Sequence, residues 1–130
     1  MSVLLTLALR TVMADVVAIV SAKSPFTTMS KSEVADIFLG KVNPLAHGTR
    51  AVPIDQAEGS AARDAFYAKI AGKSPAQIKA YWSKIIFTGR GRPPAAVSSD
   101  IDMKKRVASN PLAIGYVEAE SVDDSVRVLL

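Results

Sequence analysis

The chain has no cysteine among its 130 residues. Without thiols it can form neither a disulfide framework nor a thiolate metal site, and it has no cysteine nucleophile. It has one histidine, His47, within a segment that contains proline and glycine but no partner motif, so we expect a solvated loop residue there. These absences leave few groups for metal binding or nucleophilic catalysis.

The familiar catalytic and nucleotide-binding motifs are also absent. The segment Glu58–Ala62 does not match the Gly-x-Ser-x-Gly elbow of hydrolases. The basic loop Gly89–Pro94 has neither the preceding strand nor the Gly-Lys-Ser/Thr ending of a phosphate-binding P-loop. Asp55, Glu58 and Asp64 lie close in sequence, but acid–base catalysis needs a pocket that no pattern indicates. We therefore predict a protein that is not an enzyme and holds no cofactor or metal.

Basic residues are in modest excess, with a net charge of +4 and a sequence pI near 9.5. This excess favours anionic partners but is too diffuse to indicate nucleic acid. The one run of three basic residues, Lys104–Arg106, lies beside Asp100 and Asp102 and has no interleaved aromatic residues. We expect a solvated helix face there and no nucleic-acid partner. With 49% hydrophobic and 22% charged residues, the composition is typical of one globular domain.

Long hydrophobic runs are lacking too. The mostly apolar segment Val3–Leu9 is too short to span a bilayer, and Val12 and Ala14 are placed before Asp15 as in a signal-peptidase site. We predict a signal peptide over residues 1–14, a single domain over residues 15–130, and a periplasmic location. The alternative is that Val3–Leu9 is an ordinary strand or helix of the fold.

Strand patterns alternate with helix patterns along the rest of the chain. Asp15–Ser21 is β-branched and continuous, as in a strand buried on both faces. Ser30 and Ser74 each open a capping box that begins a helix. Other strands are predicted at Ala51–Asp55, Leu112–Val117 and Val126–Leu130, and other helices from Ser60 and from Ser99 or Asp100. This alternation predicts an α/β layered fold with a mostly parallel sheet.

Two finer expectations concern packing. In the helix after Ser74, five residues at helical spacing predict a buried stripe: Ile78, Tyr81, Trp82, Ile85 and Ile86. We therefore expect the two aromatic residues, Tyr81 and Trp82, to belong to the core. Gly115, inside a predicted strand, indicates that a neighbouring element or a ligand approaches the backbone closely there.

The segment Ile54–Phe66 has the most informative arrangement: a strand, a turn containing Gly59, and a helix that begins at Ser60. A helix N-terminus presents free backbone N–H groups and the positive end of the helix dipole, which together can hold an anion. Arg63, in the first helical turn, would add a charged donor. The alternative is that Ser60 only caps its own helix.

Several short motifs occur in a characteristic order between Val16 and Val117. They are Phe38-Leu39-Gly40-Lys41, Val52-Pro53-Ile54, Gly59-Ser60-x-x-Arg63-Asp64-x-Phe66, Tyr81-Trp82, Ile86-Phe87-Thr88-Gly89-x-Gly91-x-Pro93-Pro94 and Ile114-Gly115-Tyr116-Val117. The series resembles the phosphate-binding proteins of phosphate ABC transporters, which belong to the type 2 periplasmic binding protein superfamily. The resemblance implies a lobe built as a three-layer α/β sandwich with a mostly parallel central sheet.

The same resemblance implies an anion site. The family grips phosphate with an Arg-Ser-Asp-Gly-Ser-Gly-Thr turn, where this chain has Gln56-Ala57-Glu58-Gly59-Ser60-Ala61-Ala62. Gly59 and Ser60 match, whereas Gln56 replaces the arginine and Ala62 the threonine. Gly59, Ser60, Ala61, Ala62 and Arg63 are therefore the predicted phosphate-binding residues, with Gln56 and Glu58 placed around them. Glutamine cannot replace the charge-assisted bidentate contact of arginine.

The chain corresponds to one lobe, whereas full-length relatives close two lobes on phosphate. An anion on one lobe stays half in water, which predicts a dissociation constant of roughly millimolar or weaker. The resemblance implies a periplasmic solute-binding protein for phosphate or a similar oxyanion. Its partners would be an ABC transporter permease or another envelope protein, with a homodimer as one way to close the site. The alternative is a regulatory or interaction module of the envelope that keeps the fold but binds phosphate weakly or not at all.

Overall fold

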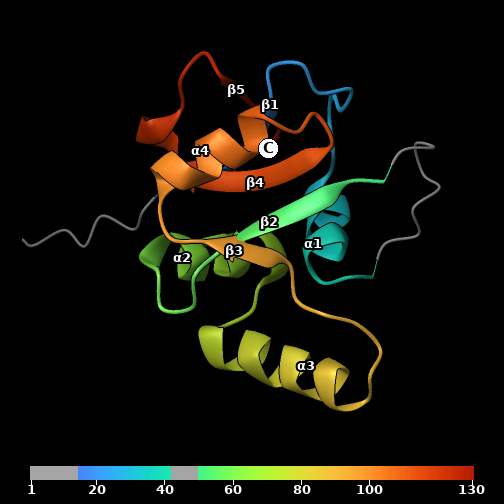
Figure 1. Cartoon of the computed structure of the whole chain (residues 1–130). Coiled ribbons are helices and arrows are strands. Elements are labelled where there is room, and N and C mark those ends of the chain that lie inside the picture. The colour runs from blue at the N-terminus through green and yellow to red at the C-terminus, as the bar shows by residue number, and fades with distance from the viewer. Residues whose placement is uncertain (1–14, 42–49) are drawn as a thin grey trace, which may run out of the picture.

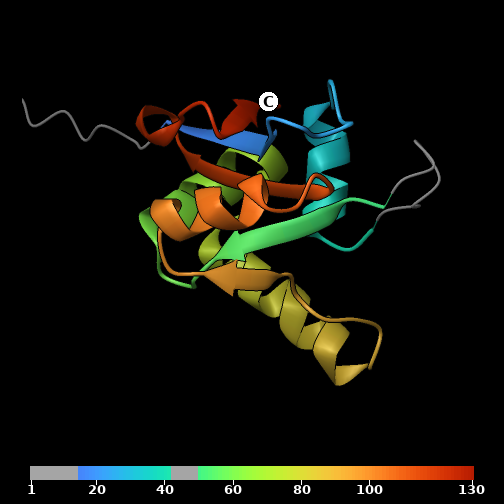
Figure 2. The same cartoon turned by 45° about the horizontal axis from the view of Figure 1, so that its top comes forward.

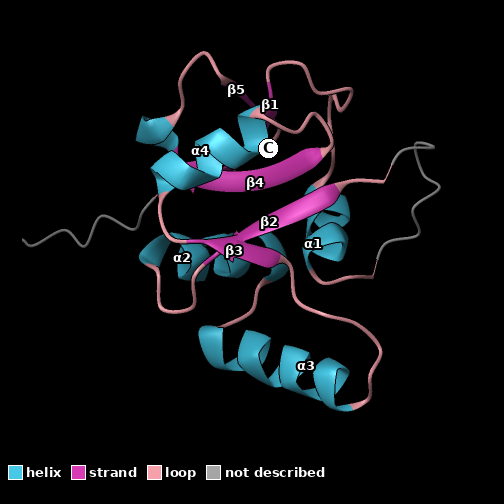
Figure 3. Cartoon of the chain, in the orientation of Figure 1, coloured by secondary structure: helices cyan, strands magenta, loops and turns pink. Residues whose placement is uncertain are grey.

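The structure is a computed structural model that describes residues 15–41 and 50–130. The predicted signal peptide and His47 lie outside the described residues. Figures 1 and 3 show the elements, which are listed here in chain order: β1 (Val16–Ser21), α1 (Lys31–Phe38), β2 (Val52–Gln56), α2 (Ala61–Ala71), α3 (Pro75–Phe87), β3 (Ala95–Val97), α4 (Asp100–Ala108), β4 (Ala113–Glu118), a 3₁₀ turn (Ala119–Ser121) and β5 (Val126–Val128).

The five strands form one mixed sheet in the order β3-β2-β4-β1-β5. β2 pairs in parallel with both β3 and β4, while β1 pairs antiparallel with β4 and with β5. Four strands therefore run in one direction and β1 alone runs against them. The α/β prediction with a mostly parallel sheet is confirmed.

Helices cover both faces of the sheet, as a three-layer sandwich requires (Figures 1 and 2). α1 and α2 bury Phe38 and Phe66 against one face, where Phe66 stacks on the Tyr116 ring of β4 with centroids 4.0 Å apart. α4 buries Met103 and Val107 against the other face. β1 is buried along nearly its whole length because it lies between these two layers.

Local capping signals explain where several helices begin and end. Ser30 and Ser74 both form complete capping boxes, and Pro75 occupies the first turn of α3. α2 ends at Gly72, which has φ +63° and donates its N–H to Ala68 O. A left-handed C-cap of this kind favours glycine because other residues are strained there.

Gly115 confirms the expected close approach, and the neighbour is α4. A Cβ placed on Gly115 would lie 2.4 Å from Met103 Sδ and 2.8 Å from Val107 Cγ2. Only glycine lets α4 pack this closely on the centre of β4.

The predicted buried stripe of α3 is only partly correct. Ile78 and Trp82 are buried and Tyr81 and Ile85 half-buried, but Ile86 is 56% exposed. α3 makes few contacts outside α2 and stands apart from the sheet (Figure 1), so only the side that faces the body is covered. The prediction for Ile86 was wrong because helical spacing shows which face is apolar, not how far the covering layer extends.

No helix in the described part of the chain is long and apolar enough to cross a membrane. The described residues also contain no group of three or more His, Cys, Asp or Glu side chains that could hold a metal ion.

Candidate functional site

The candidate anion site lies where β2 ends and α2 begins. β2 ends at Gln56, the chain turns through Gly59 with φ +90°, and Ser60 caps α2 by accepting a hydrogen bond from Arg63 N at 3.0 Å. A positive φ of this size makes glycine the suitable residue at position 59. A Cβ added there would meet no atom within 4 Å, so the approach to the turn is open.

The first turn of α2 has unused backbone donors. Ser60 N donates to Ala57 O, and Asp64 N donates to Ser60 O. The N–H groups of Ala61 and Ala62 have no hydrogen-bond acceptor among the described residues. Free N–H groups at the first turn carry the positive end of the helix dipole.

The Ser60 hydroxyl is only weakly engaged as a donor. Its oxygen accepts from Arg63 N, and its proton is directed to Gln56 Oε1 at 3.5 Å, the outer limit of a hydrogen bond. The hydroxyl can therefore turn towards a better acceptor without losing its capping bond.

Gln56 is turned into the protein. It is 3% exposed, and its Nε2 donates to Asp100 Oδ1 at 2.8 Å and to Tyr116 O at 3.1 Å. Both amide hydrogens are therefore used. At the position where the resemblance places an arginine, the Gln56 amide nitrogen holds α4 and β4 together, while Oε1 remains on the side of Ser60.

Asp100 is the other half of this contact. Its Oδ2 accepts from Glu118 N at 3.1 Å and from Ser121 Oγ at 2.8 Å, while Oδ1 accepts from Gln56. One carboxylate thus ties the first turn of α4 to the ends of β2 and β4. Sequence reasoning treated Asp100 only as a helix-start residue.

Beneath the turn, Asp55 forms the most buried charged centre of the described chain. It is 2% exposed and accepts hydrogen bonds from the Tyr116 hydroxyl, from the Tyr67 hydroxyl at 2.5 Å and from Gln56 N at 2.8 Å. Arg63 Nη1 lies 4.0 Å from Asp55 Oδ2. Hydrogen bonds and an opposite charge of this kind are what a buried carboxylate requires.

Arg63 is therefore directed at the network and not freely into solvent. Its Nη1 donates to Gln56 O at 3.1 Å, and its guanidinium lies over the Tyr67 ring, 5.6 Å from the centroid. The side chain keeps 17% of its surface exposed. Arg63 offsets the negative charge of Asp55, so the N-terminus of α2 does not face an uncompensated carboxylate.

Burial and the Asp55 carboxylate raise the pKa of both tyrosines well above their usual value. For Tyr67 the main cause is burial, followed by the charge of Asp55 and the hydrogen bond to it. The pKa of Tyr116 is raised by the same causes in the same order. Ionising either hydroxyl would place a second negative charge beside Asp55 in a site closed to water.

Glu58 contributes little to this centre. It is exposed and lies 3.7 Å from the equally exposed Lys79 Nζ on α3. Such a surface pair is worth little. The predicted residues Gly59, Ser60, Ala61, Ala62 and Arg63 thus share one turn, with Gln56 behind it and Glu58 beside it.

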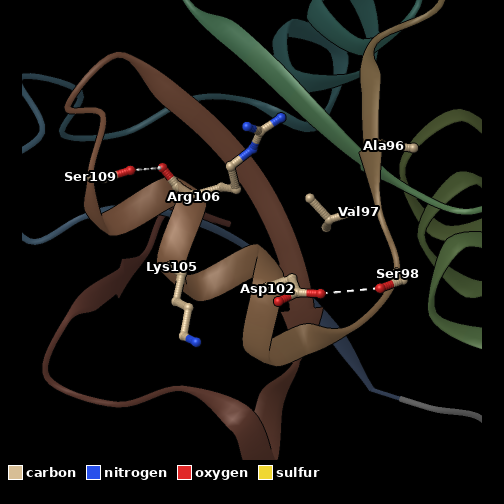
Figure 4. Close-up of a pocket in the computed structure, with 7 residues that line it drawn as sticks. All are labelled: Ala96, Val97, Ser98, Asp102, Lys105, Arg106 and Ser109. Carbon is tan, nitrogen blue, oxygen red and sulfur yellow. Dashed lines mark hydrogen bonds between the residues drawn. The ribbon is translucent and has the colours of Figure 1, made fainter.

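A separate hollow of about 560 Å³ lies between β3 and α4 (Figure 4). It is lined by Ala96, Val97, Ser98, Asp102, Lys105, Arg106 and Ser109. Two of these lining residues are bonded to each other, since Ser98 Oγ donates to Asp102 Oδ2 at 3.1 Å. The exposed Lys105 and Arg106 fit the predicted solvated helix face.

The third member of the basic run is paired. Lys104 Nζ lies 2.9 Å from Asp123 Oδ2. Hydrogen bonds from Ser125 and then from Lys104 lower the pKa of Asp123 to about 2. None of the residues that line the hollow between β3 and α4 is a buried polar residue, so this hollow is not the main candidate site.

A second hollow of about 600 Å³ lies between the end of α1 and α3. Tyr81 and Trp82 line it, together with the basic side chains of Lys84, Arg90 and Arg92. Sequence reasoning did not identify this hollow because its walls come from two helices distant in sequence.

Comparison with known proteins shows which solved structures share this fold. No family model matches the chain, and no curated protein matches it. Among solved structures, an ABC-type phosphate transport receptor from Vibrio cholerae is similar at 18% identity with a TM-score of 0.68, covering 88% of this chain. A putative phosphate ABC transporter substrate-binding protein with bound phosphate from Clostridium perfringens is similar at 24% identity with a TM-score of 0.69 and the same coverage. The chain shares its fold with these phosphate receptors.

A possible phosphate binding protein from Planctomyces limnophilus is also similar, at 15% identity with a TM-score of 0.61. The chain spans 45%, 44% and 40% of the three solved chains, which is less than half of each. The resemblance noted in the motifs is thus matched by the fold of a single lobe.

Proposed function

We propose that this chain is a solute-binding protein for a phosphate-class oxyanion, held at the N-terminus of α2. The observation that carries the proposal is the pair of unused N–H groups at Ala61 and Ala62, beside the Ser60 hydroxyl at an open turn. Of the solved proteins with this fold, one is named a phosphate transport receptor and another a putative phosphate transporter substrate-binding protein with bound phosphate. A binding role, not a catalytic one, is consistent with those names.

The anion would accept hydrogen bonds from three donors. Ala61 N and Ala62 N supply two, and the Ser60 hydroxyl supplies the third by leaving its long contact to Gln56. Arg63 contributes its charge from the first turn while it stays paired with Asp55. Gly59 keeps the approach free of side-chain atoms.

This half-site predicts weak binding by the lobe alone. Three hydrogen bonds of ~0.5–1.5 kcal/mol each, less the cost of immobilising the ligand, correspond to a Kd of roughly millimolar or weaker. Tighter binding requires a second surface to exclude water. A second copy of the chain or another lobe would supply it, and an ABC transporter would receive the solute. The periplasmic location is proposed together with the predicted signal peptide.

Isothermal titration with phosphate, and with sulfate for comparison, tests the proposal. Ser60→Asp is the informative variant, because aspartate caps a helix as well as serine but places a carboxylate where the anion would lie. Ser74→Asp is the matched control, since it makes the same change at the N-cap of α3.

We expect phosphate binding to be lost in Ser60→Asp and retained in Ser74→Asp. Equal phosphate affinity in both variants would reject the site. Sedimentation of the native chain with and without phosphate tests whether a second copy closes the site. In that case we expect dimerisation that depends on phosphate and is lost in Ser60→Asp.

A further inference from the structure

The chain has an uneven charge distribution that the anion site does not explain. Residues 65–99 contain no Asp or Glu and six basic residues: Lys69, Lys73, Lys79, Lys84, Arg90 and Arg92. This stretch comprises most of α2, all of α3, the loop that leads to β3, and β3 itself. Lys69 and Lys79 have acidic partners, Asp15 and Glu58. The other four have none among the described residues.

The end of α3 combines this charge with exposed apolar side chains. Phe87, the last residue of the helix, is 91% exposed, and Ile86 is 56% exposed. Lys84, Arg90 and Arg92 are exposed beside them. We call these five residues the α3 tip.

The α3 tip projects from the molecule. α3 stands apart from the sheet, and its C-terminal end with the following loop reaches furthest from the body in both views (Figures 1 and 2). The side chains of Arg90 and Arg92 make no hydrogen bond or ion pair within the described chain. They are free to follow the positions of external anionic groups.

The surroundings of the tip do not cancel its charge. Burial raises the pKa of Tyr81, and the charge of Asp36 on the neighbouring α1 raises it further. Lys41 lies over the same ring, with Nζ 5.7 Å from the centroid. One acidic and one basic residue thus lie near this ring, so they leave the positive charge of Lys84, Arg90 and Arg92 uncancelled.

We propose that the α3 tip docks the protein on a membrane surface rich in anionic lipids, with Phe87 and Ile86 entering the interface. A protruding apolar apex ringed by Lys and Arg matches the headgroup boundary, where apolar side chains are buried and basic ones contact lipid phosphates. The α3 tip is poorly suited to pair with the α3 tip of a second copy, because the pairing would bring like charges together. The hollow beside the tip gives a headgroup a basic, aromatic-lined recess.

Vesicle sedimentation of the full chain tests this inference. Vesicles of phosphatidylglycerol and phosphatidylcholine are compared with vesicles of phosphatidylcholine alone, at low and high salt. We expect binding to the anionic vesicles that decreases as salt is raised, and little binding to the neutral ones. Absence of binding to the anionic vesicles at low salt would overturn the proposal.

Charge reversal locates the contact. Arg90→Glu with Arg92→Glu should lower the bound-to-free ratio at least about thirty-fold, since losing each basic residue at an anionic surface costs about fivefold and the new carboxylates add repulsion. Lys105→Glu with Arg106→Glu on α4 alters the net charge equally and serves as the matched control. Equal losses in both pairs would assign the binding to net charge and overturn a specific role for the tip.

Phe87→Ser tests the apolar contribution. We expect at least about a tenfold loss of vesicle binding, whereas Ile101→Ser, at a residue 63% exposed on α4, should have little effect. Both positions are exposed, so folding should be preserved, and circular dichroism verifies it. Unchanged vesicle binding in Phe87→Ser would contradict membrane docking. It would also be contradicted if the native chain did not bind vesicles but formed a dimer that Phe87→Ser disrupts.

Discussion

The buried tyrosine–carboxylate cluster predicts that the protein loses stability steeply in alkali. Tyr67 and Tyr116 are 2% and 0% exposed, and both donate to Asp55. Their pKa values in the folded protein are raised well above the ordinary value of 10.0. At a pH between the ordinary pKa and the raised pKa of a tyrosine, the unfolded chain has lost the hydroxyl proton that the folded chain keeps. The unfolded state is then favoured as the pH rises.

The size of the effect follows from the number of buried hydroxyls. Each tyrosine that stays protonated in the folded state lowers the free energy of unfolding by ~1.4 kcal/mol for every pH unit above about 10. Two such tyrosines give a loss of ~2.7 kcal/mol at about pH 11 relative to neutral pH. Below about pH 10 both states keep the protons, so the stability is unaffected by these groups.

Urea unfolding between about pH 8 and pH 11 measures this slope, with the fluorescence of Trp82 as the signal because this single tryptophan is buried. Tyr67→Phe should remove about half of the alkaline slope, although it lowers stability at neutral pH by removing a hydrogen bond to a charged group. Ile78→Val is the control, since it lowers stability by trimming a buried apolar side chain but removes no hydroxyl.

The reasoning would be refuted if Tyr67→Phe kept the full alkaline slope of the native chain. It would also be refuted if Ile78→Val reduced the slope as much as Tyr67→Phe does. Either result would mean that tyrosine burial beside Asp55 does not control alkaline unfolding.

Two further predictions concern packing and the Gln56 contact. In thermal unfolding, Gly115→Ala should destabilise the fold by ~1–3 kcal/mol, because its Cβ would meet Met103 Sδ at 2.4 Å. Gly91→Ala is the control and should have almost no effect, because its Cβ would lie an ordinary 3.6 Å from Ile85 Cγ2. Gln56→Leu should cost ~1.5–3 kcal/mol in urea unfolding, because it removes the amide that bonds to the charged Asp100; a cost within experimental error would show that this contact is not made in solution.

Elements with signals inside their own sequence were predictable. The capping boxes at Ser30 and Ser74 begin helices where expected, and the β-branched run at residues 15–21 forms the buried strand β1. β3 was not predicted. Its three residues are extended because Ala95–Val97 pair with the end of β2, and no local pattern carries that information.

The candidate site shows the same division. The turn through Gly59 and the cap at Ser60 follow from a local pattern, and the structure places them as expected. The directions taken by Gln56 and Arg63 do not, because they are set by Asp100 and Asp55, whose roles depend on contacts across the sheet. Sequence alone could therefore place the donors but not the network behind them.

The strand order has a consequence for how the chain acquires its structure. Within the described residues β1 pairs only with β4 and β5, which follow it in the chain after all the other strands of the sheet. Val16 is aligned with Glu118, about a hundred residues later, so this pairing closes a very long loop. Contacts of such long range slow folding and delay it until β4 has been synthesised. Until then β1 remains an apolar segment without a sheet partner, and a chain shortened before β4 would leave it exposed to aggregation.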